Sequence, residues 1–240
     1  MKIRFLGFIL LINSFIATSQ VQKLENYKNF DRELVTFGVQ LGVNKNNYTL
    51  IPDKDAFSKY GYTSIENITQ PGAQVGMLIS LKLGTPIARL RLIPTFSFQE
   101  RVINYYTHPK DVGGKEGFNQ ERINASNLDF PLLLQLRTLR HGNFTAFCLF
   151  GGQYTIDLQS VQDKTQNLID PFIKVKKKDW MAQVGGGVEF FAEYFKCGLE
   201  LKYSQGFNNV LIQDHSVVSS PIKSLMNNSW ILSITFEGGK

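Results

Sequence analysis

The residues that could carry out chemistry in this chain are few and scattered. Three histidines occur among 240 residues: His108, His141 and His215. His215 lies between Asp214 and Ser216, and an acid, an imidazole and a hydroxyl are the parts of a hydrolase triad. Adjacent residues of one loop do not form a triad by themselves, and the chain has no Gly-x-Ser-x-Gly motif. The sequence therefore predicts no catalytic residues, no enzyme activity and no cofactor.

The two cysteines, Cys148 and Cys197, are too few for a disulfide scaffold or a zinc ribbon. Both fall on the apolar phase of alternating segments that are separated by one further segment. In a sheet this arrangement puts their Cα atoms about 9–10 Å apart, whereas a disulfide needs less than about 7 Å. We expect two free thiols that face lipid, with no redox role and no metal site.

The densest charge run is Lys174-Val175-Lys176-Lys177-Lys178. It fits the solvated flank of a loop, and it also fits a contact with an anionic lipid headgroup or an acidic partner. The whole chain has 26 Lys and Arg against 20 Asp and Glu, a formal net charge of +6. This balance is too weak to indicate a nucleic-acid partner.

The N-terminus has the pattern of an export signal. Lys2 and Arg4 precede a short apolar run, and small residues follow at Ala17 and Ser19. A basic start, a short apolar stretch and small residues at the cleavage point predict a secretory signal peptide over 1–19. A transmembrane anchor is the alternative, but Asn13 interrupts the run and it is too short. A short N-terminal segment, 20–33, then precedes the main domain, 34–240.

Apolar and polar residues alternate with a period of two in eight segments, which predicts eight strands. The segments are 35–44, 75–84, 89–99, 128–137, 144–157, 180–190, 195–203 and 229–237. Each is about ten residues long or a little more, enough to cross a bilayer when tilted. We expect an all-β, eight-stranded antiparallel up-and-down barrel in an outer membrane.

The connections between these segments alternate in length. The expected long loops are 45–71, 104–125, 159–178 and 206–227, and the expected tight turns are 84–88, 138–143 and 192–195. In bacterial outer-membrane barrels long loops face outward and tight turns face the periplasm. The mean hydropathy of −0.12 is then an average over lipid-facing and lumen-facing residues that alternate.

The less apolar face of the strands decides between this barrel and a soluble one of lipocalin type. It carries small residues together with charges of both signs, which suit a narrow lumen filled by paired side chains better than a wet outer surface. The expected lumen charges are Arg89, Arg91, Arg137, Asp157 and Glu189. At eight strands the conduction of small ions is not expected.

Several segments resemble a known family. Asp129-Phe130-Pro131-Leu132-Leu133-Leu134-Gln135 resembles a strand of Bacteroidota outer-membrane barrels. More specific segments look like the PorT (SprT) family of these barrels. They are 37–44, 90–98 running into Glu100-Arg101, 194–204 with Glu200 and Lys202, and 206–211 with Gly206 and Asn209.

The resemblance implies a non-enzymatic accessory or assembly component of the type IX secretion system. That system exports cargo with C-terminal signal domains and in many relatives supports gliding motility. The implied partners are outer-membrane lipid and other secretion components. Departures from the family pattern are Cys197 and Gln135, where relatives carry other residues. Two alternatives remain: a generic small outer-membrane barrel for adhesion or envelope integrity, and a lipid-modifying enzyme at the barrel rim.

Overall fold

The computed structural model describes residues 26–53, 55, 61–107, 117–162, 172–214 and 216–238. The predicted signal peptide over 1–19, His108 and His215 lie outside the described residues. Across the described part of the chain, no helix is long and apolar enough to cross a membrane.

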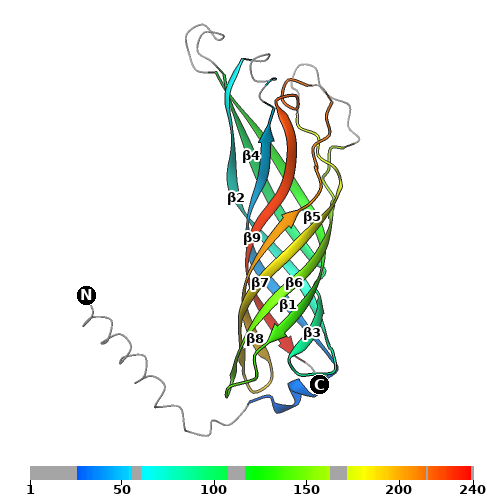
Figure 1. The fold of residues 1–240 in the computed structure, drawn as a ribbon. Helices are drawn as coiled ribbons and strands as arrows, with labels where there is room; N and C mark the ends of the chain where they lie inside the picture. The colour runs from blue at the N-terminus through cyan, green and yellow to red at the C-terminus, as the bar shows by residue number, and fades with distance from the viewer. Residues whose placement is uncertain are drawn as a thin grey trace, which may run out of the picture.

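The described residues form nine antiparallel strands and one short 3-10 helix, η1, Lys28–Asp31. The strands are β1 (Val35–Pro52), β2 (Tyr62–Lys82), β3 (Ala88–Leu92), β4 (Thr95–Thr107), β5 (Gly117–Arg137), β6 (Phe144–Asp157), β7 (Lys178–Phe191), β8 (Lys196–Gly206) and β9 (Ile222–Gly238). Strand β1 pairs with both β2 and β9, so the sheet closes into a barrel (Figure 1). The predicted all-β antiparallel barrel is confirmed.

One predicted strand, 89–99, is divided into β3 and β4 around Ile93 and Pro94. Both β3 and β4 pair with β2 on one side and β5 on the other, so together they occupy one place in the ring. The proline has no N–H, yet its carbonyl accepts from Met77 N at 3.0 Å, and Ile93 N donates to Pro131 O at 3.1 Å. The ring therefore has eight positions, as the sequence predicts.

The register fixes the tilt of the strands. Following paired residues around the ring from Lys45 of β1 returns to β1 at Val35, ten residues away. The path is Lys45, Trp230, Tyr203, Val184, Phe150, Leu134, Leu90, Leu81 and Val35. A shift of ten residues over eight strands corresponds to a tilt of about 40°, given about 3.3 Å per residue and 4.8 Å between strands.

The outward face is apolar and carries two aromatic belts. At the outer belt the rings of Tyr154 and Trp180 are 4.8 Å apart, and those of Tyr203 and Trp230 are 4.9 Å apart. At the inner belt Phe190 is paired with Phe144. The eleven residues of β7 from Trp180 to Phe190 are ten steps along the strand, which at a tilt of about 40° span roughly 25 Å, the height of the lipid-facing band of such barrels.

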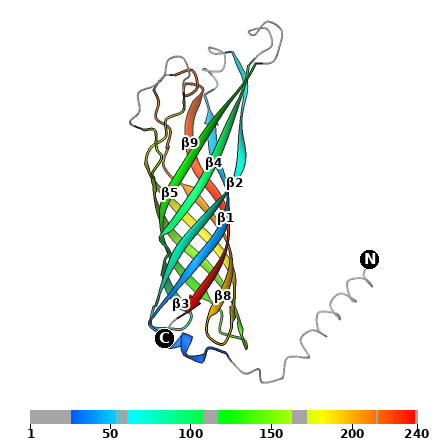
Figure 2. The same ribbon diagram turned by 180° about the vertical axis from the view of Figure 1, so that it is seen from behind.

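Two of the predicted long loops are largely strand. Most of 45–71 and 104–125 belongs to β1, β2, β4 and β5, which continue past the outer belt, and Figure 2 shows β2, β4 and β5 reaching highest. The prediction was wrong there because it followed outward-facing apolar residues, and that pattern stops where the strands leave the lipid. Hydrogen bonding between strands does not depend on lipid, so the strands continue beyond the outer belt.

Beyond the outer belt the apolar side chains turn inward. Buried residues of the long strands meet buried residues of the outer loops in one cluster, the outer core. Its members are Tyr48, Ile103, Tyr105, Ile123, Ile173, Val175, Val210, Leu211, Val218, Ile222 and Leu225. Because water surrounds this part, burial there follows the usual rule for soluble proteins. The outer core closes the outer end of the barrel.

The interior within the lipid-facing band is not only small and charged, as expected from the sequence. It also holds a compact apolar layer made of Leu78, Ile93, Leu133, Phe147 and Leu149. Gly187 makes room for one of these rings, since a Cβ at this position would lie 2.8 Å from Phe147 Cζ.

Candidate functional site: the charged lumen and its periplasmic plug

Glu200 joins two buried cations in the lumen. Its Oε1 accepts from Arg91 Nη1 at 2.6 Å, and its Oε2 accepts from Lys202 Nζ at 2.9 Å. Lys202 Nζ also donates to Gln40 Oε1 at 2.8 Å. The three charged side chains come from β3 and β8, and all are buried. Charges buried in this way are stable only when paired and hydrogen-bonded.

A second group surrounds Glu189 nearer the periplasmic end. Lys196 Nζ lies 2.6 Å from Glu189 Oε1 and 2.6 Å from Glu237 Oε2. The Glu189 carboxylate also accepts from Gln135 Nε2 at 2.7 Å and from Thr145 Oγ1 at 3.0 Å. Gln135, which departs from the resembled family pattern, therefore donates to a buried acid.

Asp129 of the family-like segment lies at a third level of the lumen. Its carboxylate accepts from Ser97 Oγ at 2.8 Å and from Thr155 Oγ1 at 2.7 Å. Pro131 and Leu133 of the same segment also point inward and are buried. The hydrogen bonds of Asp129 hold β5 against β4 and β6, so its visible role is structural.

From the middle of the lumen to its periplasmic end, the barrel wall supplies more buried cations than carboxylates. The buried cationic side chains are Arg89, Arg91, Arg137, Lys196 and Lys202, and their buried acidic partners are Glu189, Glu200 and Glu237. The N-terminal segment offsets part of this excess with one carboxylate and with backbone carbonyls. Asp31 forms an ion pair with Arg137, and Arg89 Nη2 donates to Phe30 O at 2.8 Å.

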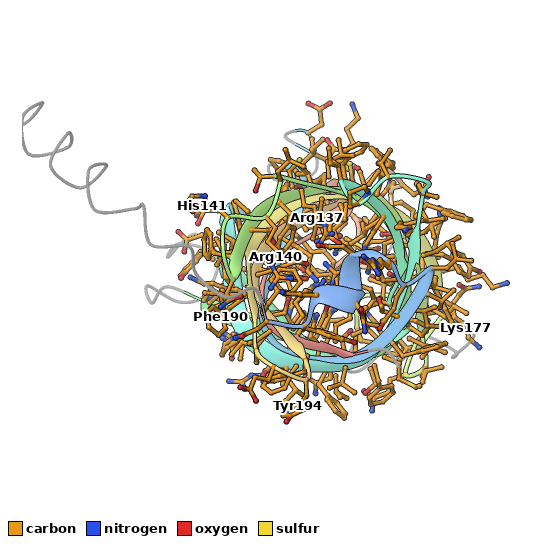
Figure 3. All side chains as sticks on the ribbon, turned by 90° about the horizontal axis from the view of Figure 1, so that it is seen from below. Arg137, Arg140, His141, Lys177, Phe190 and Tyr194 are labelled. Atoms are coloured by element: carbon orange, nitrogen blue, oxygen red, sulfur yellow. The ribbon has the colours of Figure 1, made fainter. Side chains whose placement is uncertain are left out.

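Phe30 seats this segment in the mouth of the barrel. Its ring is fully buried and lies 5.5 Å from the ring of Phe191. The Arg89 guanidinium and the Lys196 ammonium each lie 4.3 Å from its centroid, a favourable cation–π geometry. Figure 3, viewed from the periplasmic end, shows η1 lying across the opening. We call residues 26–33 the plug.

Arg140 of the β5–β6 turn fastens the plug from the side. Its guanidinium lies 4.0 Å from the Phe191 ring centroid and donates to the carbonyl of Asn26. Asn26 N donates to Asn143 Oδ1 of the same turn at 2.8 Å. The sequence prediction missed Phe30, Asp31 and Arg140. The available signal was a pair of aromatics, Tyr27 and Phe30, in the otherwise polar segment 26–33.

Two cavities in the upper lumen are small. One of about 20 Å³ lies between Tyr48, Arg101, Asp157 and Asp179, and one of about 10 Å³ lies below it beside Asp129. Each has room for about one water molecule. The Arg101 guanidinium lies 4.9 Å from the Tyr48 ring centroid and separates the charged lumen from the outer core. The plug lies below these cavities and the outer core above them, so the described side chains pack the lumen at both ends.

Comparison with known families identifies this architecture. Residues 20–211 match the family described as outer membrane protein beta-barrel domain. The chain belongs to this outer-membrane barrel family. No curated protein sequence matches the chain.

Similar solved structures are also outer-membrane proteins. OprG from Pseudomonas aeruginosa is 11% identical, with 86% of this chain and 95% of that chain covered and a TM-score of 0.47. Neisserial surface protein A is 8% identical, with 85% and 98% covered and a TM-score of 0.42. The outer membrane protease OmpT from Escherichia coli is 10% identical, with 85% and 96% covered and a TM-score of 0.45.

The remaining family-like positions of this outer-membrane barrel lie at the base of the outer loops. Asn209 Oδ1 accepts from Leu211 N at 3.1 Å and from Leu225 N at 2.9 Å, which ties the loop after β8 to β9. A Cβ at Gly206 would lie 2.9 Å from Asp179 Oδ2. Both positions therefore shape the loop base.

Asp214 and Ser216, the described neighbours of His215 in the sequence, are hydrogen-bonded to each other and to Ser219. Asp214 Oδ1 accepts from Ser219 Oγ at 2.6 Å and from Ser216 N at 3.2 Å. Burial acts to raise the pKa of Asp214, but these hydrogen bonds outweigh it and hold the pKa below its ordinary value. His141 is placed in the β5–β6 turn, where its backbone pairs with Phe144. Among the residues with described positions, no three or more His, Cys, Asp and Glu side chains could hold a metal ion.

The cysteines and the lysine run are placed on the outer surface of the barrel. Cys148 is exposed, Cys197 is half-buried, and both thiols are free, as expected. Lys176, Lys177 and Lys178 are exposed, and Lys176 Nζ donates to Asn209 O at 2.9 Å.

Proposed function

We propose that this outer-membrane barrel is a non-enzymatic, non-conducting support that presents its outer end to the cell exterior, in adhesion or in maintaining the envelope. It needs no cofactor, and its constant partner is outer-membrane lipid. The filled lumen carries this proposal, because paired charges, an apolar layer and the plug leave cavities for about one water molecule each. A barrel of this kind has little use as a pore.

The outer end of the barrel is the part best suited to contact molecules outside the cell. The strands β1, β2, β4 and β5 extend beyond the outer aromatic belt and are held together by the outer core. Tyr105 OH donates to Val218 O at 2.8 Å, so a long strand and an outer loop are joined directly. A rigid projection supported in this way suits binding outside the cell, since little order is lost on contact.

Conductance and deletion phenotype test the proposal together. Purified full-length protein in a planar lipid bilayer is expected to show no steady ionic current, and stable channels would overturn the sealed-barrel part. Cells without the gene are expected to lose surface attachment or to become sensitive to detergents. Complementation should fail with residues 207–221 replaced by a short Gly-Ser linker and succeed with the matched periplasmic variant Tyr194→Ser.

A second candidate is an accessory role in type IX secretion, exerted through the same outer end or through the periplasmic turns. The resemblance of segments 37–44, 90–101 and 194–211 to the PorT family supports it. In such a role the barrel would assemble or stabilise a separate translocon, since its own lumen is filled.

Fractionation of the deletion strain separates the two candidates. Under the secretion role, cargo with C-terminal signal domains accumulates in the periplasm and gliding, where present, is lost. Normal export together with loss of attachment or detergent resistance would leave only the first candidate.

A further inference from the structure

Three exposed lysines stand immediately outside the outer aromatic belt. Lys178 and Trp180 lie two residues apart on β7, on the same outward face, and the Trp180 side chain is 60% exposed. Two residues of a strand tilted by about 40° rise roughly 5 Å. Tryptophan rings of such belts lie at headgroup level, so the ammonium of Lys178 reaches the headgroups. We call Lys176, Lys177 and Lys178 the lysine patch.

The backbone of the lysine patch is held on both sides. Lys178 pairs with Ile156 of β6, and Lys177 O accepts from Asp157 N at 2.8 Å. Lys176 N donates to Val210 O at 2.8 Å, and its ammonium donates to Asn209 O. In Figure 3 the Lys177 side chain projects away from the barrel wall. These backbone hydrogen bonds therefore hold the three lysines next to one another at one place on the barrel perimeter.

Within the described part of the chain, no carboxylate forms an ion pair with the lysine patch. Asp157, which interacts electrostatically with Lys177, is itself buried on the lumen side of the wall. Outward from the wall, the next layer is lipid headgroups.

We propose that the lysine patch binds the phosphate groups of an anionic glycolipid in the outer leaflet. The neighbouring belt provides the rest of such a site: Trp180 and the 68% exposed Phe207 give apolar surface for acyl chains below the phosphates. Ammonium groups form charge-assisted hydrogen bonds with phosphate oxygens, and clusters of basic residues beside a membrane recognise anionic headgroups. A lipid fits better than an acidic protein because the patch is continuous with the lipid-facing surface.

Binding of purified lipid A tests this proposal. The delipidated full-length protein in nonionic detergent is titrated with diphosphoryl lipid A, and bound lipid is counted by native mass spectrometry. The triple variant K176Q/K177Q/K178Q is expected to bind roughly fivefold more weakly for each lysine removed, since one basic residue near an anionic surface contributes about 1 kcal/mol. The control K223Q/R122Q also removes exposed positive charge, but farther outward, and should bind like the wild type. A heat-modifiable band on gels verifies that each variant is folded.

Each other outcome overturns the proposal. Equal binding by the wild type and the triple variant would show that the patch does not contribute. Equal binding of lipid A without phosphates would assign the interaction to the acyl chains alone. Inorganic phosphate raising the melting temperature as much as lipid A does would replace the glycolipid by a free anion.

Discussion

The Arg89 guanidinium lies over the ring of Phe30, with its Cζ 4.3 Å from the ring centroid, and it donates to the Phe30 carbonyl. One buried cation of the wall thus binds both the side chain and the backbone of the plug. The plug is thereby part of the lumen rather than a tether beside it, because it brings an aromatic face, carbonyl groups and the Asp31 carboxylate to a network rich in cations.

Replacing Phe30 tests whether the plug is held in this way. Phe30→Ala is expected to destabilise the folded barrel by about 3–5 kcal/mol, the usual cost of deleting a buried phenylalanine, and to expose Arg32 to trypsin in detergent. Phe190→Ala is the control, because that ring faces lipid and is 54% exposed. Equal rates of cleavage at Arg32 in both variants and the wild type would contradict the assignment.

In the middle of the lumen, replacement of Glu200 is expected to lower the stability of the barrel most. Glu200→Gln leaves Arg91 and Lys202 buried with too little negative charge and is expected to cost about 3–5 kcal/mol in urea unfolding. The exposed Glu66→Gln serves as a control and should change stability by less than about 0.5 kcal/mol. The double variant R91Q/E200Q should recover part of the loss, since one unmatched cation is removed. Additive effects would argue against a direct pair.

Tyr105 connects the outer loops to the long strands. Its hydroxyl is buried, and burial raises its pKa above the ordinary value, so it stays protonated and donates to Val218 O. Tyr105→Phe should weaken the outer core by about 1–3 kcal/mol, because Val218 O loses its donor. Hydrogen exchange should rise around 210–222 while the strands within the lipid-facing band stay protected. A uniform rise through the barrel would refute a local role.

The low folded pKa of Asp214 predicts that the outer loop 207–221 becomes less stable in acid. Because its folded pKa lies below the ordinary value of 3.8, the ionised carboxylate stabilises the turn at neutral pH. That stabilisation fades as the pH falls from about 4 through the folded pKa. Limited proteolysis by pepsin across this pH range should show faster cleavage within 207–221 at the acid end. In Asp214→Asn the cleavage rate should already be high at pH 4 and change less with pH.

The lipid-facing part of this barrel could be read from the sequence residue by residue. Leu41, Met77, Val184 and Leu232 are exposed to the surroundings as their phase requires, because a strand with lipid on one side and a narrow lumen on the other must alternate. The same rule placed Arg89, Arg91, Arg137, Asp157 and Glu189 on the inner phase, where the structure has them buried. Alternation is a local property of one strand, so the face of each side chain can be predicted without knowing which strands lie beside it.

The extent of the strands and the contents of the two ends required the tertiary structure. Beyond the outer belt water replaces lipid, so the apolar side chains of Tyr48 and Ile103 turn inward and the local pattern no longer marks a strand. The plug depends on contacts between residues far apart in the chain, such as Asn26 with Asn143 and Asp31 with Arg137. The sequence by itself determined which side chains face lipid, since that follows from neighbours along one strand. Only the closed ring decided which charges pair and what closes the barrel, because closure brings strands from the whole chain around one narrow space.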